Sequence, residues 1–384
     1  MRIAYVTETY PPEFNGVSLN AARSVGYLRK RGHVVELIRP MRQDEIERDS
    51  PEEWLTPSLA LPLSQDQRLG LPILWRLQKR WEKRRPQVVH VATEGPLAWA
   101  AVRAAQTLSI PVTSDFCANA NEYSSHYGRG WAGPVVMAYL RHFHNAADLT
   151  FVPTQTLRHR LFTEGFQALE VLGRGVDTRL FSPDHYQVSL REQWGAAPGE
   201  PVMLYSGQLN AEENAELACQ TFQAVHAYMP ELRMVVVGDG PLLETLRQRH
   251  PEVHFVGNQR GSTLAEHYAS ADILLYPSLS DGCSNVLLEA MASGMAVLAF
   301  DCGAAAEYID DCVNGMLVTP GDVQGFVDDA YQMANELSRF LSLRLQARTS
   351  AQRHQWDTVL SRFEGALRQL GSETEQREVA YLPT

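Results

Sequence analysis

The sequence has no long apolar run, no paired cysteines and no excess of basic residues. No apolar stretch reaches the roughly 18 residues that a transmembrane helix needs, and the first run turns polar by Thr7, unlike a signal peptide. The five cysteines are odd in number and none is spaced C-x-x-C, so neither a disulfide framework nor a zinc ribbon is indicated. A net charge of −11 excludes a nucleic-acid binder that relies on a basic surface. We expect a cytoplasmic protein in a reducing compartment.

Strand-like and helix-like segments alternate along the whole chain. Such alternation indicates parallel sheets with helices on both faces, so the fold class is α/β with doubly wound, Rossmann-like domains. The predicted strands are 2–7, 33–40, 87–92, 111–115, 148–153, 201–207, 232–240, 253–257, 272–278, 295–300 and 314–320.

A length of 384 residues suggests two domains. We predict an N-terminal domain over 1–183, a second over 184–353, and a C-terminal helix with a tail over 354–384. The polar, Pro- and Gly-containing stretch 184–201 is predicted to link the domains. Ligands of such sheets bind at the carboxyl ends of the strands, which places a ligand in a cleft between two facing domains.

The segment SGQLNAEEN, residues 206–214, has the form of a phosphate-binding turn without the charge. Gly207 follows an apolar strand and polar residues open a helix, yet the segment contains no Lys or Arg. It carries Glu212 and Glu213 instead. The later string VVVGDGPL lacks the third glycine of a dinucleotide fingerprint, so it predicts a structural turn and disfavours a dehydrogenase.

The string SDGCSNVLLEAMASG places two carboxylates eight positions apart, Asp281 and Glu289, around a helix start. Asn285 is a suitable N-cap, and the free amides that follow it can attract an anion. A carboxylate such as Glu289 can accept bonds from the vicinal hydroxyls of a ribose, and Asp281 from those of a sugar. Taken singly, each is more simply a turn or solvated helix residue. The whole string after ADILLYPS favours the functional interpretation.

Four strings carry a family resemblance: TETYPPEFNGVSLNAARSVGYLRKRGHVVELIRP, GRGVDTRLFSP, YASADILLYPS and LLEAMASGMAVLAF. Through them the chain resembles the retaining nucleotide-sugar glycosyltransferases of GT-B fold. That family includes bacterial GDP-mannose-dependent mannosyltransferases and sulfolipid synthases. The resemblance covers nearly the whole chain and implies two Rossmann-like domains facing a central cleft. It implies that the C-terminal helix returns to the first domain. It also implies catalytic positions at Asp281 and Cys117, and the donor-binding positions Gly16, Val17, Gly207, Gln208, Glu213, Asn285, Val286 and Glu289.

No D-x-D occurs in the sequence, and no H-x-E or clustered histidine pattern offers a metal site. Many nucleotide-sugar transferases hold a divalent metal through D-x-D, and its absence fits the GT-B pattern. We therefore expect no metal and no cofactor, with a nucleotide diphosphate sugar as donor substrate. The Gly16 loop is expected to approach that donor, because a glycine permits close backbone contact, although a plain turn glycine would look the same.

The departures from the family pattern lie in its pocket. The resembled proteins have an Arg and a Lys on the donor diphosphate where this chain has Gln208 and Glu213, and a His or Arg near the reacting sugar where it has Cys117. Two functions therefore stay open. The first is metal-independent transfer of a hexose, with retention, to a lipid or glycan acceptor. The second is a catalytically impaired relative that acts as a binding or partner subunit. Guanine with mannose and uracil with glucose are both compatible donors.

One basic stretch stands out on this acidic chain. Residues 69–87 gather six Arg and Lys residues beside Trp75 and Trp81. The stretch predicts a peripheral membrane contact through Trp75–Arg85 at the inner face of a membrane. The alternative is an ordinary solvated helix whose tryptophans pack inward. No nucleic acid is expected as a partner.

Overall fold

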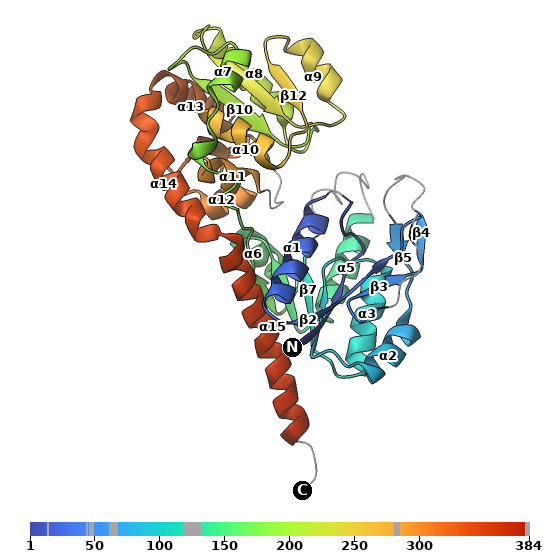
Figure 1. Ribbon diagram of the computed structural model, residues 1–384. Coiled ribbons are helices and arrows are strands. Elements are labelled where there is room, and N and C mark those ends of the chain that lie inside the picture. Colours follow the sequence, from blue (N-terminus) through green and yellow to red (C-terminus); the bar gives the residue numbers. More distant parts are fainter. Residues whose placement is uncertain are drawn as a thin grey trace. The chain divides into compact units, whose positions relative to one another are not determined.

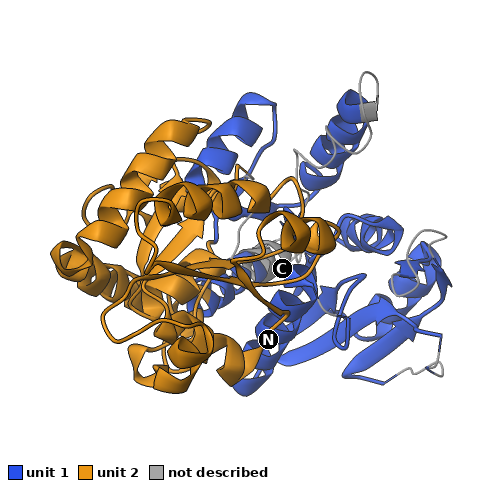
Figure 2. Ribbon diagram, turned by 90° about the horizontal axis from the view of Figure 1, so that it is seen from above, with its two compact units in different colours: residues 1–172, 360–384 blue, residues 173–359 orange. Residues whose placement is uncertain are grey.

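The computed structural model describes residues 1–13, 15–43, 45, 50–60, 68–117, 132–279 and 285–380. The chain divides into two compact units (Figures 1 and 2): unit 1 is Met1–Leu172 with Leu360–Thr384, and unit 2 is Gly173–Val359. The predicted division at residue 183 therefore lies eleven residues later than the observed one. Within the described part of the chain, no helix is both long and apolar enough to span a bilayer.

Unit 1 is built on a seven-stranded parallel sheet with strand order β3-β2-β1-β6-β7-β8-β9. All five strands predicted for this half are present, and β3 and β9 extend the sheet at its edges. A short antiparallel pair, β4 and β5, stands apart from it. The elements are β1 (Arg2–Val6), α1 (Gly16–Lys30), β2 (Val34–Pro40), β3 (Glu53–Thr56), β4 (Ser58–Ala60), β5 (Arg68–Gly70), α2 (Leu74–Lys83), β6 (Val88–Val91), α3 (Pro96–Thr107), β7 (Val112–Asp115), α5 (Ala132–His144), β8 (Leu149–Val152), α6 (Gln155–Thr163) and β9 (Leu169–Val171).

Unit 2 contains a six-stranded parallel sheet with strand order β12-β11-β10-β13-β14-β15, and its strands match the six predicted ones. The elements are η1 (Pro183–His185), α7 (Val188–Gln193), β10 (Val202–Ser206), α8 (Ala215–His226), β11 (Arg233–Val237), α9 (Leu243–Arg249), β12 (His254–Gly257), α10 (Gly261–Ser270), β13 (Ile273–Tyr276), α11 (Val286–Ala292), β14 (Ala296–Phe300), α12 (Gly303–Tyr308), β15 (Met316–Val318), α13 (Val323–Asn335), η2 (Leu337–Phe340), α14 (Leu341–Ala351) and η3 (Gln352–His354).

Alternate side chains of the strands enter separate cores on the two faces of each sheet. On β10, Val202 and Leu204 belong to the core beneath α10 and α11, whereas Met203 and Tyr205 belong to the core beneath α8 and α13. A strand buried on both faces reads as a continuous apolar run, which is why these strands could be recognised in the sequence. The sheets thereby fix the loops at their carboxyl edges.

The stretch 184–201 is not a linker, contrary to the prediction. It forms η1 and α7 and packs into unit 2, where Trp194 is buried in the core. Arg191 is buried as well, and its guanidinium forms an ion pair with Asp272 at 2.9 Å. Composition alone was misleading, because a polar segment can be buried when its charge finds a partner.

The last helix, α15 (Trp356–Ala380), begins in unit 2 and continues in unit 1. Its apolar stripe is buried as the helical spacing predicted: Phe363 packs against the rings of His90 and Phe151 on one face of the unit 1 sheet. Glu364 is buried and pairs with His33 at 2.9 Å. Hydrogen bonds from His33, Arg368 and Arg31 lower the pKa of Glu364 to about 2, although burial opposes them.

Candidate functional site

The turn after β10 is the first candidate site in unit 2. β10 leads directly into Gly207 and the exposed Gln208. The turn lies at the carboxyl edge of a parallel sheet, where α/β proteins bind their ligands. Backbone bonds join it to the turn after β11, because the Gly207 N–H donates to Val237 O (3.1 Å) and the Leu209 N–H to Asp239 O (3.0 Å).

Two glycines in the segment Val235–Leu242 permit this close approach. A Cβ atom on Gly238 would lie 1.9 Å from the carbonyl oxygen of Gly207, and one on Gly240 would lie 2.6 Å from that of Leu209. Both glycines also have positive φ angles, +150° and +158°, which side chains disfavour. The VVVGDGPL string is therefore a structural turn, as predicted, and it supports the backbone of the candidate site.

The two altered positions of the β10 turn carry no positive charge. The Tyr205 hydroxyl donates to the Gln208 carbonyl (2.9 Å), and Asn210 Nδ2 donates to Gln208 Oε1 (3.2 Å). Asn210 Oδ1 accepts the Glu213 N–H (2.8 Å). Burial raises the pKa of Tyr205 strongly, and the nearby negative charge of Glu213 adds to this rise. The turn thus contributes one neutral amide and one carboxylate.

The second part of the site is α11, which follows β13, the strand next to β10 in the sheet. Glu289 lies half-buried in the first turns of α11, beside the Tyr268 hydroxyl, and Val286 is half-buried as well. Asn285 stands at the N-cap position, but its side chain makes no capping bond with a described residue, contrary to the prediction. Its backbone is in the αR region, whereas a capping side chain needs extended dihedral angles. Asp281 lies outside the described residues.

In unit 1, the Gly16 loop leads from β1 into α1. Asn15 caps α1, because its Oδ1 accepts the Ser18 N–H (2.8 Å), and the Ser18 hydroxyl donates to Glu13 O (2.7 Å). Gly16 is exposed, and a Cβ atom built on it would have no neighbour within 4 Å. Val17 beside it is half-buried. No described neighbour requires a glycine at position 16, so the space above it is open to a ligand.

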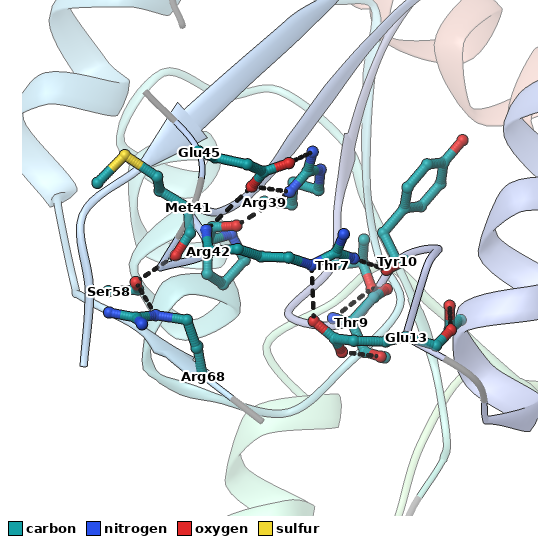
Figure 3. Close-up of polar contacts among 12 residues, drawn as sticks. Thr7, Thr9, Tyr10, Glu13, Arg39, Met41, Arg42, Glu45, Ser58 and Arg68 are labelled. Carbon is teal, nitrogen blue, oxygen red and sulfur yellow. Dashed lines mark hydrogen bonds and ion pairs between the residues drawn. The ribbon is translucent and has the colours of Figure 1, made fainter. Parts of the chain in front are cut away.

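A network of charged side chains holds this loop in place (Figure 3). Thr9 donates to Glu13 Oε2 (2.6 Å), and Glu13 also forms an ion pair with Arg42 (3.5 Å). Arg42 donates in addition to the backbone oxygen of Tyr10, and its own N–H donates to Glu45 (2.9 Å). The hydrogen bond and charge of Arg39 lower the pKa of Glu45 to about 2. The end of β2 thereby anchors the loop that precedes α1.

We expect Gly16→Ala to stabilise the fold and weaken nucleotide-sugar binding. Alanine fits the open space and improves helix propensity by about 0.5–1 kcal/mol, so the unfolding free energy should rise. The added methyl group would occupy the space proposed for the donor. Denaturant unfolding of the variant measures the change in unfolding free energy, and calorimetric titration measures the change in nucleotide-sugar affinity. A variant that is more stable and binds equally well would make Gly16 a plain helix-start glycine. Gly26→Ala in the same helix, where a Cβ atom likewise meets no neighbour, is the matched control.

Two carboxylates at the unit 1 edge were missed in the sequence. Glu8 follows β1 and Glu94 follows β6. Their positions shortly after predicted strands could have indicated that they lie at the edge of the sheet. Glu8 accepts the Leu97 N–H (3.0 Å) at the start of α3, and burial raises its pKa to about 7. Glu94 Oε1 accepts the Cys117 N–H (2.7 Å) and lies 3.6 Å from His144 Nε2.

Cys117 directs its thiol toward the sheet edge. Its Sγ donates to the backbone oxygen of Ala92 at 3.3 Å. The predicted unit 1 residues Gly16, Val17 and Cys117 therefore share the carboxyl edge of one sheet, since they follow β1 and β7, which flank β6. The predicted unit 2 residues that the structure describes follow β10 and β13, which are neighbours in the other sheet, and share its carboxyl edge. Among the described residues, no three His, Cys, Asp or Glu side chains gather in a way that could hold a metal ion.

Comparison with known proteins agrees with this arrangement. Residues 14–180 match the family described as "Glycosyltransferase Family 4", and residues 200–336 match "Glycosyl transferases group 1". A GDP-mannose-dependent alpha-mannosyltransferase of Mycolicibacterium smegmatis is 32% identical over 331 residues, which cover 85% of this chain and 86% of that protein. Sulfoquinovosyl transferase SQD2 of Arabidopsis thaliana is 27% identical over 94% of this chain and 72% of its own length.

Solved structures share the fold. Anabaena Alr3699/HepE, solved in complex with UDP and glucose, superposes with a TM-score of 0.73 at 17% identity, covering 96% of this chain and all of that one. WaaG, a glycosyltransferase involved in lipopolysaccharide biosynthesis, gives a TM-score of 0.68 at 16% identity, covering 95% of this chain and 99% of that one. The chain has the GT-B fold and belongs to the group 1 family of glycosyltransferases, which use nucleotide-sugar donors.

Proposed function

We propose that the protein transfers a hexose from a nucleotide diphosphate sugar to a lipid or glycan acceptor, with retention of configuration and without a metal ion. GDP-mannose is the first donor to test, because several of the relatives are named for it. UDP-glucose is the second. In unit 2, the Gly207 turn would lie against the donor and Glu289 would hold the ribose hydroxyls. The roles of Gly16, Cys117 and Asp281 stay predictions from the family resemblance.

The turn at Gly207 is the observation that carries this proposal. Gly238 and Gly240, in the turn after β11, allow that turn to lie close to the backbone at Gly207. Side chains at positions 238 and 240 would collide with this backbone. The charges at Gln208 and Glu213 differ from those at the corresponding positions of the resembled family. The turn therefore combines a close backbone approach with one neutral amide and one carboxylate.

The same two residues support the alternative of a catalytically impaired relative. Two unit charges 4 Å apart interact by about 4 kcal/mol at an effective dielectric constant of 20. A carboxylate in place of a lysine can therefore lower diphosphate affinity by several powers of ten, at about 1.4 kcal/mol for each tenfold change. An impaired protein would act as a binding or partner subunit.

Calorimetric titration with GDP, UDP, GDP-mannose and UDP-glucose decides between these functions. A transferase should bind one base in preference to the other and slowly hydrolyse its nucleotide sugar, and the released sugar should keep its anomeric configuration by NMR. The turnover should survive EDTA. If an intact, folded protein binds none of the four ligands, the transferase proposal is wrong and the partner-subunit proposal gains support.

A second proposal concerns the membrane, and a basic groove along α2 favours it. The groove, of about 560 Å³, is lined by Pro51, Trp54, Trp75, Arg76, Lys79, Arg80, Lys83 and Arg84. The two tryptophans of the predicted membrane-contact stretch differ in burial: Trp81 is buried in the core, whereas Trp75 is 68% exposed. Arg80 pairs with Glu36 at 2.5 Å and stacks on Trp54.

Three other cations of the groove are available to a surface. Lys79, Lys83 and Arg84 are exposed, and no carboxylate of a described residue pairs with them. We propose that this groove, with the exposed Trp75, attaches the protein peripherally to an anionic membrane at its cytoplasmic face. Basic residues gain about 1 kcal/mol each near such a surface, and tryptophan favours the interface.

We expect Lys79→Ala with Lys83→Ala to weaken binding to anionic liposomes about thirtyfold, because two contributions of about 1 kcal/mol are lost. The measurement is co-sedimentation with vesicles that contain or lack phosphatidylglycerol. Lys30→Ala with Arg103→Ala removes the same charge from exposed positions on α1 and α3 and is the control. Equal losses in both variants would indicate a diffuse charge effect, and binding that ignores the anionic lipid would remove the proposal.

A further inference from the structure

Tyr268, on α10, carries a hydroxyl group that the fold buries without giving it a hydrogen-bond partner. The residue has no exposed surface, and its ring packs edge-on against Phe181 with the centroids 5.7 Å apart. Its hydroxyl makes no hydrogen bond with a described residue. Leaving a buried hydroxyl unsatisfied is unfavourable, and phenylalanine would fill the same space without that cost. Packing alone therefore does not account for a tyrosine here.

Two polar neighbours of this hydroxyl belong to the candidate donor site. Ser206 is the last residue of β10, immediately before the Gly207 turn, and Glu289 lies in α11. Both lie close enough to the hydroxyl to influence its pKa, which Ser206 lowers and Glu289 raises. Burial first, and then the Glu289 charge, raise the pKa of Tyr268 well above its usual value. Tyr268 is thus a protonated donor beside a carboxylate that is assigned to the ribose.

We propose that Tyr268 is a positioning residue of the donor site, which donates to one oxygen of Glu289 and directs the other toward the ribose hydroxyls of a bound nucleotide. The inference rests on the proposed function. A carboxylate has two oxygens and about four acceptor positions, so it can serve both partners at once. A side chain held by a second group loses less conformational freedom when the ligand arrives. The buried hydroxyl gains its missing hydrogen bond in the same step.

Tyr268→Phe tests this role by comparing ribose with deoxyribose. Calorimetric titrations use GDP, 2′-deoxy-GDP, UDP and 2′-deoxy-UDP. The unaltered protein should prefer the ribonucleotide of its base. In the variant, affinity for the ribonucleotide should fall about tenfold while affinity for the deoxy form changes little, so the preference collapses. The Tm should stay the same or rise, because the variant removes an unsatisfied group.

Two further variants separate positioning from structure. Phe181→Leu loosens the packing around the Tyr268 ring and should lower the Tm without changing the ribose preference. In a Glu289→Ala background, Tyr268→Phe should have no further effect on nucleotide affinity, because the group that it positions is gone.

An equal loss of ribo- and deoxyribonucleotide affinity in Tyr268→Phe would overturn the inference and leave the proposed function standing. An undiminished effect of Tyr268→Phe in the Glu289→Ala background would do the same. If the unaltered protein binds none of the four nucleotides, the inference and the proposed function fail together.

Discussion

We expect the double variant Gln208→Arg, Glu213→Lys to bind nucleoside diphosphates at least a hundredfold more tightly than the unaltered protein. The change removes one negative charge and adds two positive ones beside a turn whose backbone is already held by hydrogen bonds to Val237 and Asp239. At the effective dielectric constant of a protein surface, one charge pair at 4–8 Å contributes about 2–4 kcal/mol, so a hundredfold gain, about 2.7 kcal/mol, is a modest expectation.

Salt dependence shows whether that gain is electrostatic. Affinities measured at 0.05 M and 0.5 M NaCl should differ more for the double variant than for the parent, because salt screens the added attraction. Gln220→Arg with Glu244→Lys changes the net charge equally at exposed positions on α8 and α9 and should gain little. A parent that already binds the donor tightly, or a double variant that gains nothing, would show that other groups hold the phosphates.

We also expect Glu8→Gln to stabilise the protein by up to about 3 kcal/mol at pH 8 and to have little effect near pH 4.5. The pKa of Glu8 rises from its ordinary 4.5 to about 7, chiefly through burial. The folded state therefore holds the proton more tightly, so this contribution to stability is complete below pH 4.5 and is lost as the pH rises through 7. A difference of about 2.5 pKa units corresponds to about 3 kcal/mol. Glutamine keeps an acceptor for the Leu97 N–H.

Denaturant unfolding of parent and variant at pH 5, 6, 7 and 8 measures this effect. The difference in unfolding free energy should grow with pH and level off above 7. The lowered pKa values of Glu45 and Glu364 do not interfere, because their contributions are present above pH 4.5 and are lost only as the pH falls toward 2. Glu82→Gln on the exposed face of α2 is the control. A difference that stays constant from pH 5 to 8 would mean that Glu8 titrates normally.

Much of the candidate site was accessible from the sequence, because its residues follow strands. The strands of both sheets are apolar runs buried on two faces, and the polar residues after them necessarily lie at one edge. This reasoning identified Gly207 and Glu289, whereas Gly16 came from the family resemblance. It passed over Glu8 and Glu94, although they stand at equivalent places, because a single acidic residue after a strand carries no motif.

The sequence by itself determined the alternation of strands and helices, the family and the absence of cations at Gln208 and Glu213. These follow from residue types and short spacings, which local physics governs. Only the tertiary structure decided which polar groups are buried and with whom. Arg191 became a core residue through Asp272, and Tyr268 came to lie beside Glu289, 21 positions away along the chain. Such pairings depend on contacts between separate elements, and the energy of a buried charge or hydroxyl depends on those contacts more than on its neighbours in sequence.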